Sequence, residues 1–280
     1  MHLNDLRSLL FVPATSQHLW GKAAERGADA VIVDLEDGVP ADRKAQARVM
    51  AREAIELLAD ATPVFVRINA PEALFALDIA ALPLDRLQGV LLPKVESADE
   101  VRTLAACIAG HQAAASPALA IAALIETPLG VMEARHIATA HPSVKALGFG
   151  AEDYATEMGV PAEPQSLMWA AQAITCCARA YGLACWGLPG SIAEINDMTA
   201  FAGLVRQARR AGFSGTPCIH PRQVTVANAG FGPTDAELDW ARRVLVADVA
   251  AQADGRGVVT LDGRMIDRPI VERARRWLRS

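Results

Sequence analysis

The sequence predicts a (β/α)8 barrel, the α/β fold in which eight parallel strands alternate with helices around a closed sheet. Eight short runs rich in Val, Ile, Leu and Phe recur along the 280 residues, and Ala-rich segments with helical spacing separate them. Apolar strands that alternate with helices indicate a parallel sheet covered on both faces. Eight such units in a chain of this length fit a closed barrel. A doubly wound open sheet is the alternative, but no Gly-x-Gly-x-x-Gly follows the first strand, which disfavours its dinucleotide-binding form.

The expected strands are short, mostly apolar runs. In chain order they are SLLFVP (8–13), AVIVDLE (30–36), VFVRIN (64–69), GVLLPKVE (89–96), AIAALIET (120–127), ALGFGAED (146–153), CWGLPG (185–190) and PCIHP (217–221). The segments between them, such as 42–59 and 97–110, have the apolar spacing of amphipathic helices. The second of these begins with Ser97 as an N-cap residue and has Glu100 three positions later, which is a capping-box pattern.

A further segment follows the eighth unit. We expect the barrel domain to cover residues 1–252, including the helix after the eighth strand. The stretch VVTLDGRMID then predicts a small hairpin that turns at Asp262-Gly263, and Pro269 suits the first turn of a short final helix. Because a barrel does not need this appendage, we expect residues 253–280 to form a C-terminal extension.

Composition narrows the classes of protein and of partner. The chain has 27 Lys and Arg residues against 32 Asp and Glu, a net charge of −5 and a pI of about 5.7. Without a long basic run, this balance argues against nucleic-acid and membrane-surface partners. The longest apolar run, at 118–125, is far shorter than the roughly 20 residues that a membrane helix needs, and the N-terminus lacks the layout of a signal peptide. We therefore expect a cytoplasmic protein.

Titratable residues gather where the expected strands end. In a (β/α)8 barrel the active site forms at this carboxyl-terminal rim, on the loops that lead from strands to helices. Six of the eight strands end in such groups: Asp34, Glu36, Asp37, Arg67, Lys94, Glu96, Glu126, Asp153 and His220. Taken singly, Asp37 can shape a turn, Glu96 can cap a helix and His220 can be a packed imidazole. Taken together, they predict an enzyme site, because a purely structural barrel would scatter such groups over both ends.

Glu126 and Asp153 carry the sharpest chemical prediction. They close the fifth and sixth strands, which are neighbours in a barrel, so their carboxylates can point at one spot. Two converging carboxylates without a nearby thiol or paired imidazole suit a hard cation, and Mg²⁺ commonly takes one or two protein carboxylates and leaves other positions to water and substrate. Gly148 and Gly150 would let a ligand approach the backbone beside them. Helix capping by Asp153 is the alternative explanation.

Eight motifs, in order and spacing, resemble the citrate lyase β-subunit and malyl-CoA lyase family. They are RSLLFVP, Lys22 with GADAVIVDLEDGV, VFVRIN, LLPKVES, IETPLGV, GFGAEDY, IHPRQV and GRMIDRPIVERAR. The resemblance covers about the whole chain. It implies a (β/α)8 barrel that cleaves or forms a carbon–carbon bond next to a thioester, with Mg²⁺ as cofactor and an acyl-CoA or 2-oxo acid as small-molecule substrate. It also implies a homo-oligomer, either a trimer or a hexamer.

The resemblance assigns roles to residues at the rim. Glu126 and Asp153 resemble the metal ligands, and Glu126 is also a candidate for substrate binding. Arg67 resembles the group that binds the substrate carboxylate. Glu36 and Asp37 would then orient Arg67 or metal-bound water.

Four more residues match the family outside this group. Arg7 and Lys22 match positions near the coenzyme A phosphates or the oxo acid, and Lys94 is a further candidate for substrate binding. In the family, the segment that matches residues 253–280 is a lid that closes over a neighbouring subunit's site and supplies an acid. Asp267 of MIDRP resembles this acid and would be the general acid/base at the acyl carbon. Capping of the last helix is the structural alternative for Asp267.

Several functions stay open at this stage. A lyase for a malyl-, citramalyl- or citryl-type CoA ester comes first, with a thioesterase possible on the same barrel. A coenzyme-free aldolase for pyruvate or another 2-oxo acid is second, and a non-catalytic barrel subunit is third. Where many relatives have an aspartate–glycine–proline–aromatic stretch after the seventh strand, this chain has LPGSIAEIND (188–197). The identity of the acyl group therefore stays open. The stretch FVPATSQHLW (11–20) also lacks the glycine–asparagine pattern that is common in the family after the first strand, so the choice between coenzyme A and an acyl carrier protein stays open as well.

Overall fold

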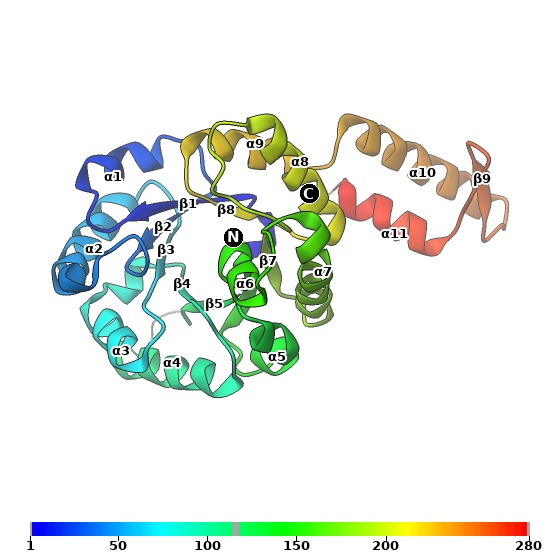
Figure 1. Cartoon of the computed structure of the whole chain (residues 1–280). Coiled ribbons are helices and arrows are strands. Elements are labelled where there is room, and N and C mark those ends of the chain that lie inside the picture. Colours follow the sequence, from blue (N-terminus) through cyan, green and yellow to red (C-terminus); the bar gives the residue numbers. More distant parts are fainter. Residues whose placement is uncertain (1, 114–117, 279–280) are drawn as a thin grey trace. The chain divides into compact units, whose positions relative to one another are not determined.

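The computed structural model describes residues 2–113 and 118–278 and confirms the (β/α)8 barrel (Figure 1). Its parallel strands are β1 (Ser8–Pro13), β2 (Ala30–Asp34), β3 (Val64–Arg67), β4 (Gly89–Leu92), β5 (Ala120–Ile125), β6 (Val144–Phe149), β7 (Ala184–Gly187) and β8 (Thr216–Cys218). They pair in the order β7-β6-β5-β4-β3-β2-β1-β8. A parallel bridge between Trp186 and Gly215 brings β7 beside the start of β8, which closes the ring and excludes the open-sheet alternative.

Helices surround the strands on the outside of the barrel (Figure 1). They are α1 (Gln17–Ala24), α2 (Lys44–Leu58), α3 (Glu72–Ala81), α4 (Ala98–His111), α5 (Pro128–Ala138), α6 (Ala151–Met158), α7 (Pro164–Ala180), α8 (Met198–Ala211) and α9 (Pro221–Phe231). Ser97 and Glu100 form the predicted capping box at the start of α4. Among the described helices, none is long and apolar enough to cross a membrane.

Two apolar cores form because successive strand residues point to opposite faces of the sheet. Outward-facing residues pack against the helices. The barrel interior is filled by Leu9, Ile32, Phe65, Leu91, Ala122, Ala146, Ala184 and Trp186. The rings of Phe65 and Trp186 meet edge to face with centroids 5.7 Å apart, in the preferred geometry for an aromatic pair. This packed interior fills the barrel below the loops of the carboxyl-terminal rim.

The C-terminal residues form a second compact unit, which begins at Gly232. It contains α10 (Asp235–Ala253), β9 (Val259–Leu261), β10 (Arg264–Ile266) and α11 (Arg268–Trp277). The predicted hairpin turn at Asp262 and Gly263 is present, with φ of 51° and 73°. The helix that we expected to complete the barrel is α10, and it instead shares a small core with α11 and the hairpin. The division therefore falls before α10 rather than after residue 252.

Candidate active site

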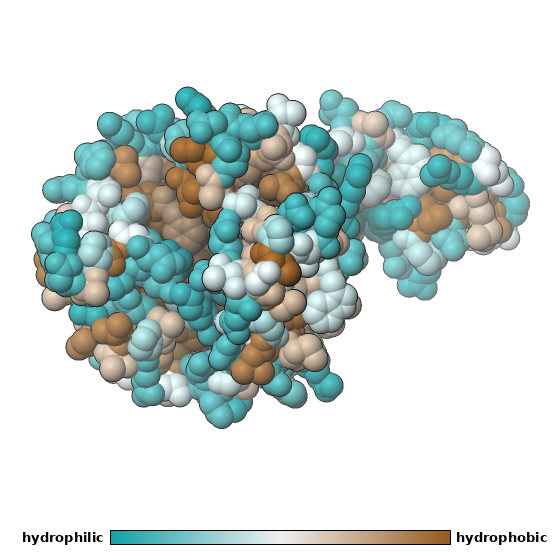
Figure 2. All heavy atoms as spheres, viewed as in Figure 1, coloured by the Kyte–Doolittle hydropathy of each residue, from teal (hydrophilic) through white to brown (hydrophobic). Residues whose placement is uncertain are grey.

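A cavity of about 430 Å³ opens at the carboxyl-terminal rim of the barrel. Its lining comes from the ends of strands and from the loops that follow them, as expected for this fold. Figure 2 looks onto this face and shows hydrophobic atoms set back in the mouth of the barrel beside hydrophilic ones. The cavity therefore combines a charged part with an apolar part.

Arg67, the last residue of β3, is the centre of the charged part. Its Nε and Nη2 donate to the two carboxylate oxygens of Asp34 at 2.7 and 2.8 Å. Its Nη1 lies 2.9 Å from Glu36 Oε2 and 3.1 Å from Asp37 Oδ2, and the guanidinium stacks over the ring of Phe11 at 4.8 Å. The structure thus brings Glu36 and Asp37 to Arg67, as predicted, and adds Asp34 as the bidentate partner.

Asp34, the last residue of β2, organises the turn that carries Glu36 and Asp37. Asp34 Oδ1 accepts a hydrogen bond from the Glu36 backbone N–H at 3.0 Å, and Oδ2 accepts one from Gly38 N–H at 2.9 Å. A Cβ at position 38 would lie 2.6 Å from Asp34 Oδ2, so the turn requires glycine there. Asp34 therefore has two functions, because it shapes the acidic loop and holds the fork of Arg67.

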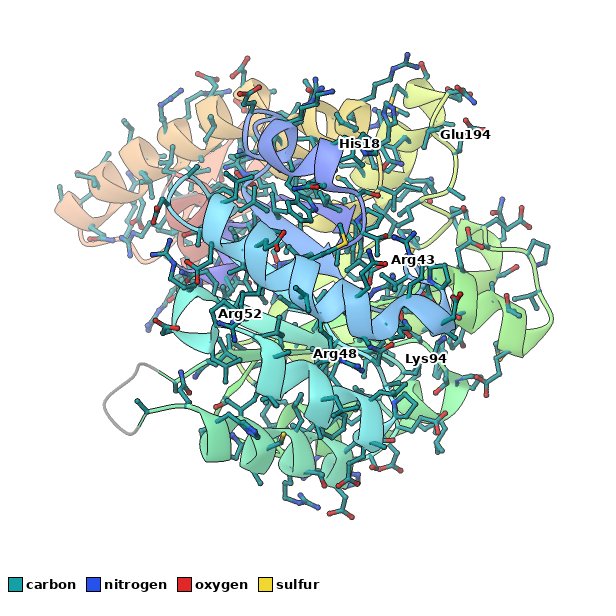
Figure 3. All side chains as sticks on the ribbon, turned by 90° about the vertical axis from the view of Figure 1, so that its left-hand side faces the viewer. His18, Arg43, Arg48, Arg52, Lys94 and Glu194 are labelled. Atoms are coloured by element: carbon teal, nitrogen blue, oxygen red, sulfur yellow. The ribbon has the colours of Figure 1, made fainter. Side chains whose placement is uncertain are left out.

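Lys94 contacts three carboxylates at the rim, those of Glu36, Glu126 and Asp153. Its backbone N–H donates to Glu126 Oε2 at 2.9 Å, and its Nζ lies 3.5 Å from Asp153 Oδ1 and 3.7 Å from Glu36 Oε1. The residue follows β4 in the left-handed region, with φ of 52°, which is uncommon for a residue with a side chain. Figure 3 shows Lys94 toward the same end of the barrel as Arg43, which directly precedes α2. Glu126 and Asp153 thus both approach one lysine at the rim.

Asp153 lies on a helix rather than at the end of a strand. The sixth strand was expected to run to Asp153, but β6 ends at Phe149 and Asp153 sits in the first turn of α6. Gly150 is the N-cap residue, so Asp153 does not cap this helix. A Cβ at position 150 would lie 2.3 Å from Glu126 Oε1, so the glycine makes room for the Glu126 side chain. Glu126, directly after β5, and Asp153, in the first turn of α6, both offer carboxylate oxygens as hard ligands.

The described residues contain no group of three or more His, Cys, Asp or Glu side chains arranged as a complete metal site. A cation held by Glu126 and Asp153 would thus keep positions for water and substrate, as Mg²⁺ commonly does in proteins.

Burial governs the protonation of the two inner glutamates. It raises the pKa of Glu126 to about 7, and the neighbouring charges of Glu36 and Asp153 add to this effect. Burial also raises the pKa of Glu36 to about 7, although the charge of Arg67 opposes it. For Lys94, burial lowers the pKa, but the charges of Asp153 and Glu36 outweigh it and hold the pKa above its usual value.

The raised pKa of these glutamates predicts how the stability of the metal-free protein depends on pH. A carboxyl whose folded pKa exceeds its unfolded pKa stabilises the fold at low pH, and this contribution disappears as the pH rises through the folded value. Between pH 4.5 and about 7, Glu126 should therefore lower the free energy of unfolding, by on the order of 3 kcal/mol. Urea unfolding in the presence of a chelator, compared between the parent and Glu126→Gln, measures this difference. Parallel pH profiles of the two proteins would contradict it.

Two of the predicted binding residues do not reach the cavity. Arg7 precedes β1, so it lies at the amino-terminal end of the barrel, where its Nη1 donates to the Asn228 carbonyl at 3.4 Å. Its backbone N–H donates to Asp29 at 2.7 Å, which is a structural contact. Lys22 is exposed in the last turn of α1 and is not among the lining residues.

Asp267 lies in the C-terminal unit, where its side chain accepts a hydrogen bond from Ile270 N–H at 3.4 Å and caps α11.

Three residues that support the rim were not predicted. Lys44 Nζ donates to the carbonyls of Leu35 and Glu36 at 2.6 Å each and so fixes the acidic loop. Asp78 is fully buried and accepts two hydrogen bonds from Asn69, two residues after Arg67. Gln223, also fully buried, joins the loops after β7 and β8. Only Gln223 had a local signal in the sequence, its position three residues after His220 at the start of a helix.

The comparisons with known proteins agree with this geometry. The sequence model described as HpcH/HpaI aldolase/citrate lyase matches residues 7–221, which is most of the chain. The chain belongs to the HpcH/HpaI aldolase/citrate lyase family. The matched range includes every strand of the barrel and every residue of the cavity lining.

Individual members of the family differ in their named activities. A citrate lyase subunit beta-like protein from Deinococcus radiodurans is 38% identical, with 98% of this chain and 96% of that protein covered. A (3S)-malyl-CoA thioesterase from Cereibacter sphaeroides is 32% identical over 98% of this chain and 94% of its own length. The crystal structure of CitE from Mycobacterium tuberculosis in complex with magnesium, acetoacetate and coenzyme A has a TM-score of 0.78 and 31% identity, and covers 97% of this chain and 96% of that one.

Proposed function

We propose that this protein is a Mg²⁺-dependent carbon–carbon lyase that cleaves a 3-hydroxyacyl-CoA thioester into an acyl-CoA and a 2-oxo acid. The observation that carries the proposal is the convergence of Glu126, Asp153 and Arg67 at one cavity on the barrel rim. The family supports the thioester chemistry, since its member CitE is described in complexes with magnesium and pyruvate and with magnesium, acetoacetate and coenzyme A.

The ligands at the rim fit Mg²⁺. Glu126 and Asp153 provide carboxylate oxygens, which are the ligands that Mg²⁺ prefers, and Gly150 leaves space beside Glu126. The ammonium group of Lys94, 3.5 Å from Asp153, shows that this place attracts a positive charge. When bound, Mg²⁺ would supply Lewis acidity toward the oxygens of the 2-oxo acid portion of the substrate.

The protein's own side chains position the substrate and transfer the protons. In the cleavage, the bond between the hydroxyl carbon and the α-carbon of the thioester breaks, the hydroxyl loses its proton and the α-carbon gains one. Arg67 places a planar, permanently charged fork beside the substrate carboxylate, and Asp34, Glu36 and Asp37 hold that fork in position. We assign the proton transfer at the α-carbon to Asp267, supplied by a neighbouring subunit.

A thioesterase is the second candidate, and the similarity to the (3S)-malyl-CoA thioesterase favours it. A screen of malyl-, citramalyl- and citryl-CoA with Mg²⁺, in which 2-oxo acid and free thiol are measured separately, distinguishes the two. A lyase releases oxo acid without thiol, whereas a thioesterase releases thiol without oxo acid. Glu133→Gln, a change on the outer surface of α5, is the matched control for variants at the rim. Absence of both products with all three esters would refute the proposal.

The assignment of Asp267 predicts complementation between subunits of a trimer or hexamer. Asp267→Asn should be inactive yet folded, because Asn is as good an N-cap residue as Asp but carries no acid. Mixed with Glu126→Gln and refolded together, it should recover part of the activity, since some sites then contain neither change. Asp239→Asn, on the exposed surface of α10, should remain active alone. Full activity of a strictly monomeric protein by light scattering would rule this arrangement out.

A further inference from the structure

One wall of the cavity is built from two loops, those after β7 and β8. Leu188 and Ile192 come from the loop 188–197, which joins β7 to α8, and Ile219 comes from the short segment between β8 and α9. Ile219 is 44% exposed although it is large and apolar, so its side chain is open to a ligand in the cavity. Figure 3 shows Glu194, in the same loop as Ile192, toward the end of the barrel that carries Lys94. The shape of this wall therefore depends on how the two loops are held relative to each other.

Gln223 caps the start of α9 with one half of its side-chain amide. Its Oε1 accepts hydrogen bonds from the backbone N–H groups of Ile219 and His220 at 2.8 and 3.1 Å. The residue is fully buried in the first turn of the helix, and a glutamine that reaches back from this turn to the residue before the helix forms half of a capping box. The side-chain oxygen of Gln223 thereby fixes the backbone that carries Ile219.

The other half of the same amide reaches the loop after β7. Its Nε2 donates to the Ile192 carbonyl at 2.7 Å, and the Glu194 carbonyl at 3.4 Å is a second, longer acceptor. A glutamine amide carries its donor and its acceptor on one planar group. One rigid group therefore sets the position of Ile192 relative to Ile219.

Other hydrogen bonds of the loop after β7 have different functions. Glu194 Oε1 accepts from two backbone N–H groups of the same loop at 2.5 and 3.2 Å, and Asp197 caps α8. Ser191 N–H donates to the Ala162 carbonyl at 3.1 Å, which anchors the loop to the connection between α6 and α7. These bonds shape the loop and hold its outer side, whereas the bonds of Gln223 tie it to the loop after β8.

We propose that Gln223 is a positioning residue for the lyase reaction, because it aligns Ile192 and Ile219 into one apolar surface that packs against the bound substrate. Gln223 is fully buried and is not among the residues that line the cavity, so it acts through the two loops. This inference rests on the proposed function and adds a residue to it. Since the proposed metal ligands belong to the segment after β5 and to α6, the alignment acts on substrate binding and not on the cation.

Gln223→Glu separates the two halves of the amide. The new carboxyl keeps an acceptor for the N–H groups of Ile219 and His220, but its ionised form has no donor for the Ile192 carbonyl and repels it. Its protonated form regains one donor and can restore that bond. For the thioester that the parent protein turns over, we expect KM to be raised roughly tenfold at about pH 8 and to return toward the parental value as the pH falls to about 5.5, with a smaller change in kcat.

Each value is compared with the parent at the same pH, because the titratable neighbours His220 and Glu194 and the acids of the cavity are common to both proteins. Gln172→Glu makes the same chemical change at an exposed position on α7 and should match the parent throughout. Calorimetry should give the parental Mg²⁺ affinity for Gln223→Glu. A purely structural role of Gln223 would lower the melting temperature and leave KM of the folded enzyme at the parental value.

Ile192→Ala tests the wall directly and decides the matter if Gln223→Glu does not fold. It should also raise KM, and adding it to Gln223→Glu should raise KM little further, because both changes remove the same contact. A parental KM in Ile192→Ala, or in folded Gln223→Glu at about pH 8, would overturn the inference and leave the lyase proposal standing. A parent protein that turns over none of malyl-, citramalyl- and citryl-CoA would refute the proposed function, and this inference with it.

Discussion

Replacing Glu126 with Gln is expected to remove Mg²⁺-dependent turnover while the barrel stays folded. The amide keeps the shape of the carboxyl and its acceptor oxygen for the Lys94 N–H, but it loses the charge that binds the cation. Because Glu126 is 5% exposed, loss of its charge also relieves a desolvation cost, so the fold should not suffer. The Mg²⁺ affinity should fall by more than the roughly 10- to 100-fold that loss of an outer-shell partner costs.

Calorimetric titration with Mg²⁺ and thermal unfolding of the same sample measure the two halves of this prediction. Glu133→Gln makes the same chemical change outside the cavity and should behave like the parent. An unchanged Mg²⁺ affinity in Glu126→Gln would show that Glu126 is not a ligand.

Arg67→Lys should lower kcat/KM by roughly 10²- to 10³-fold, the range seen when a positioned donor to a developing charge is removed. Lysine keeps the positive charge but replaces three donor nitrogens with one, so it cannot hold Asp34 in a bidentate pair and also reach Glu36, Asp37 and a substrate carboxylate.

A matched control is Arg86→Lys, since Arg86 pairs with Asp60 and Glu56 at the protein surface. We expect its steady-state kinetics to equal those of the parent. If Arg67→Lys also retained parental kinetics, Arg67 would serve only to hold the acidic loop, and the substrate carboxylate would need another partner.

The barrel was predictable from the sequence because its signal is carried by local patterns. Each strand is a short apolar run and each helix has apolar residues at a period of 3.6, so the order of elements can be read without knowing any contact. The residues of the rim were predictable for the same reason, since Arg67 ends β3 and Glu126 directly follows β5. The fold then determines that such positions meet.

Contacts that depend on side-chain direction were harder to predict from the sequence. Asp34 was noted as part of an acidic group, but its bidentate pairing with Arg67 depends on the register in which β2 pairs with β3, where the two residues lie opposite each other. Lys44 reaches back to two carbonyls over eight or nine residues, and no local motif marks that reach. For Arg7, a motif match predicted a place near the coenzyme A phosphates or the oxo acid. In the structure it precedes β1 and therefore lies at the amino-terminal end of the barrel, away from the cavity.

The extent of the C-terminal unit was also beyond the sequence pattern. The segment α10 has the length and capping box of a normal barrel helix, since Thr234 and Glu237 cap it reciprocally. Its partner is revealed only by packing, in which Val244 shares a core with Ile266 and Val271. An amphipathic helix shows that it has an apolar face but not which neighbour covers that face.

The most direct test of the account is the position of a divalent cation in crystals grown with Mn²⁺ and a 2-oxo acid such as pyruvate. Mn²⁺ prefers the same oxygen ligands as Mg²⁺ and can be located by its anomalous scattering. We predict one strong peak coordinated by Glu126 and Asp153, with the Lys94 ammonium group displaced from Asp153 and the carboxylate of the oxo acid facing Arg67. A peak elsewhere, or a fully soaked crystal in which Lys94 still pairs with Asp153 and no cation binds, would contradict the assignment of this rim as the metal site of a lyase.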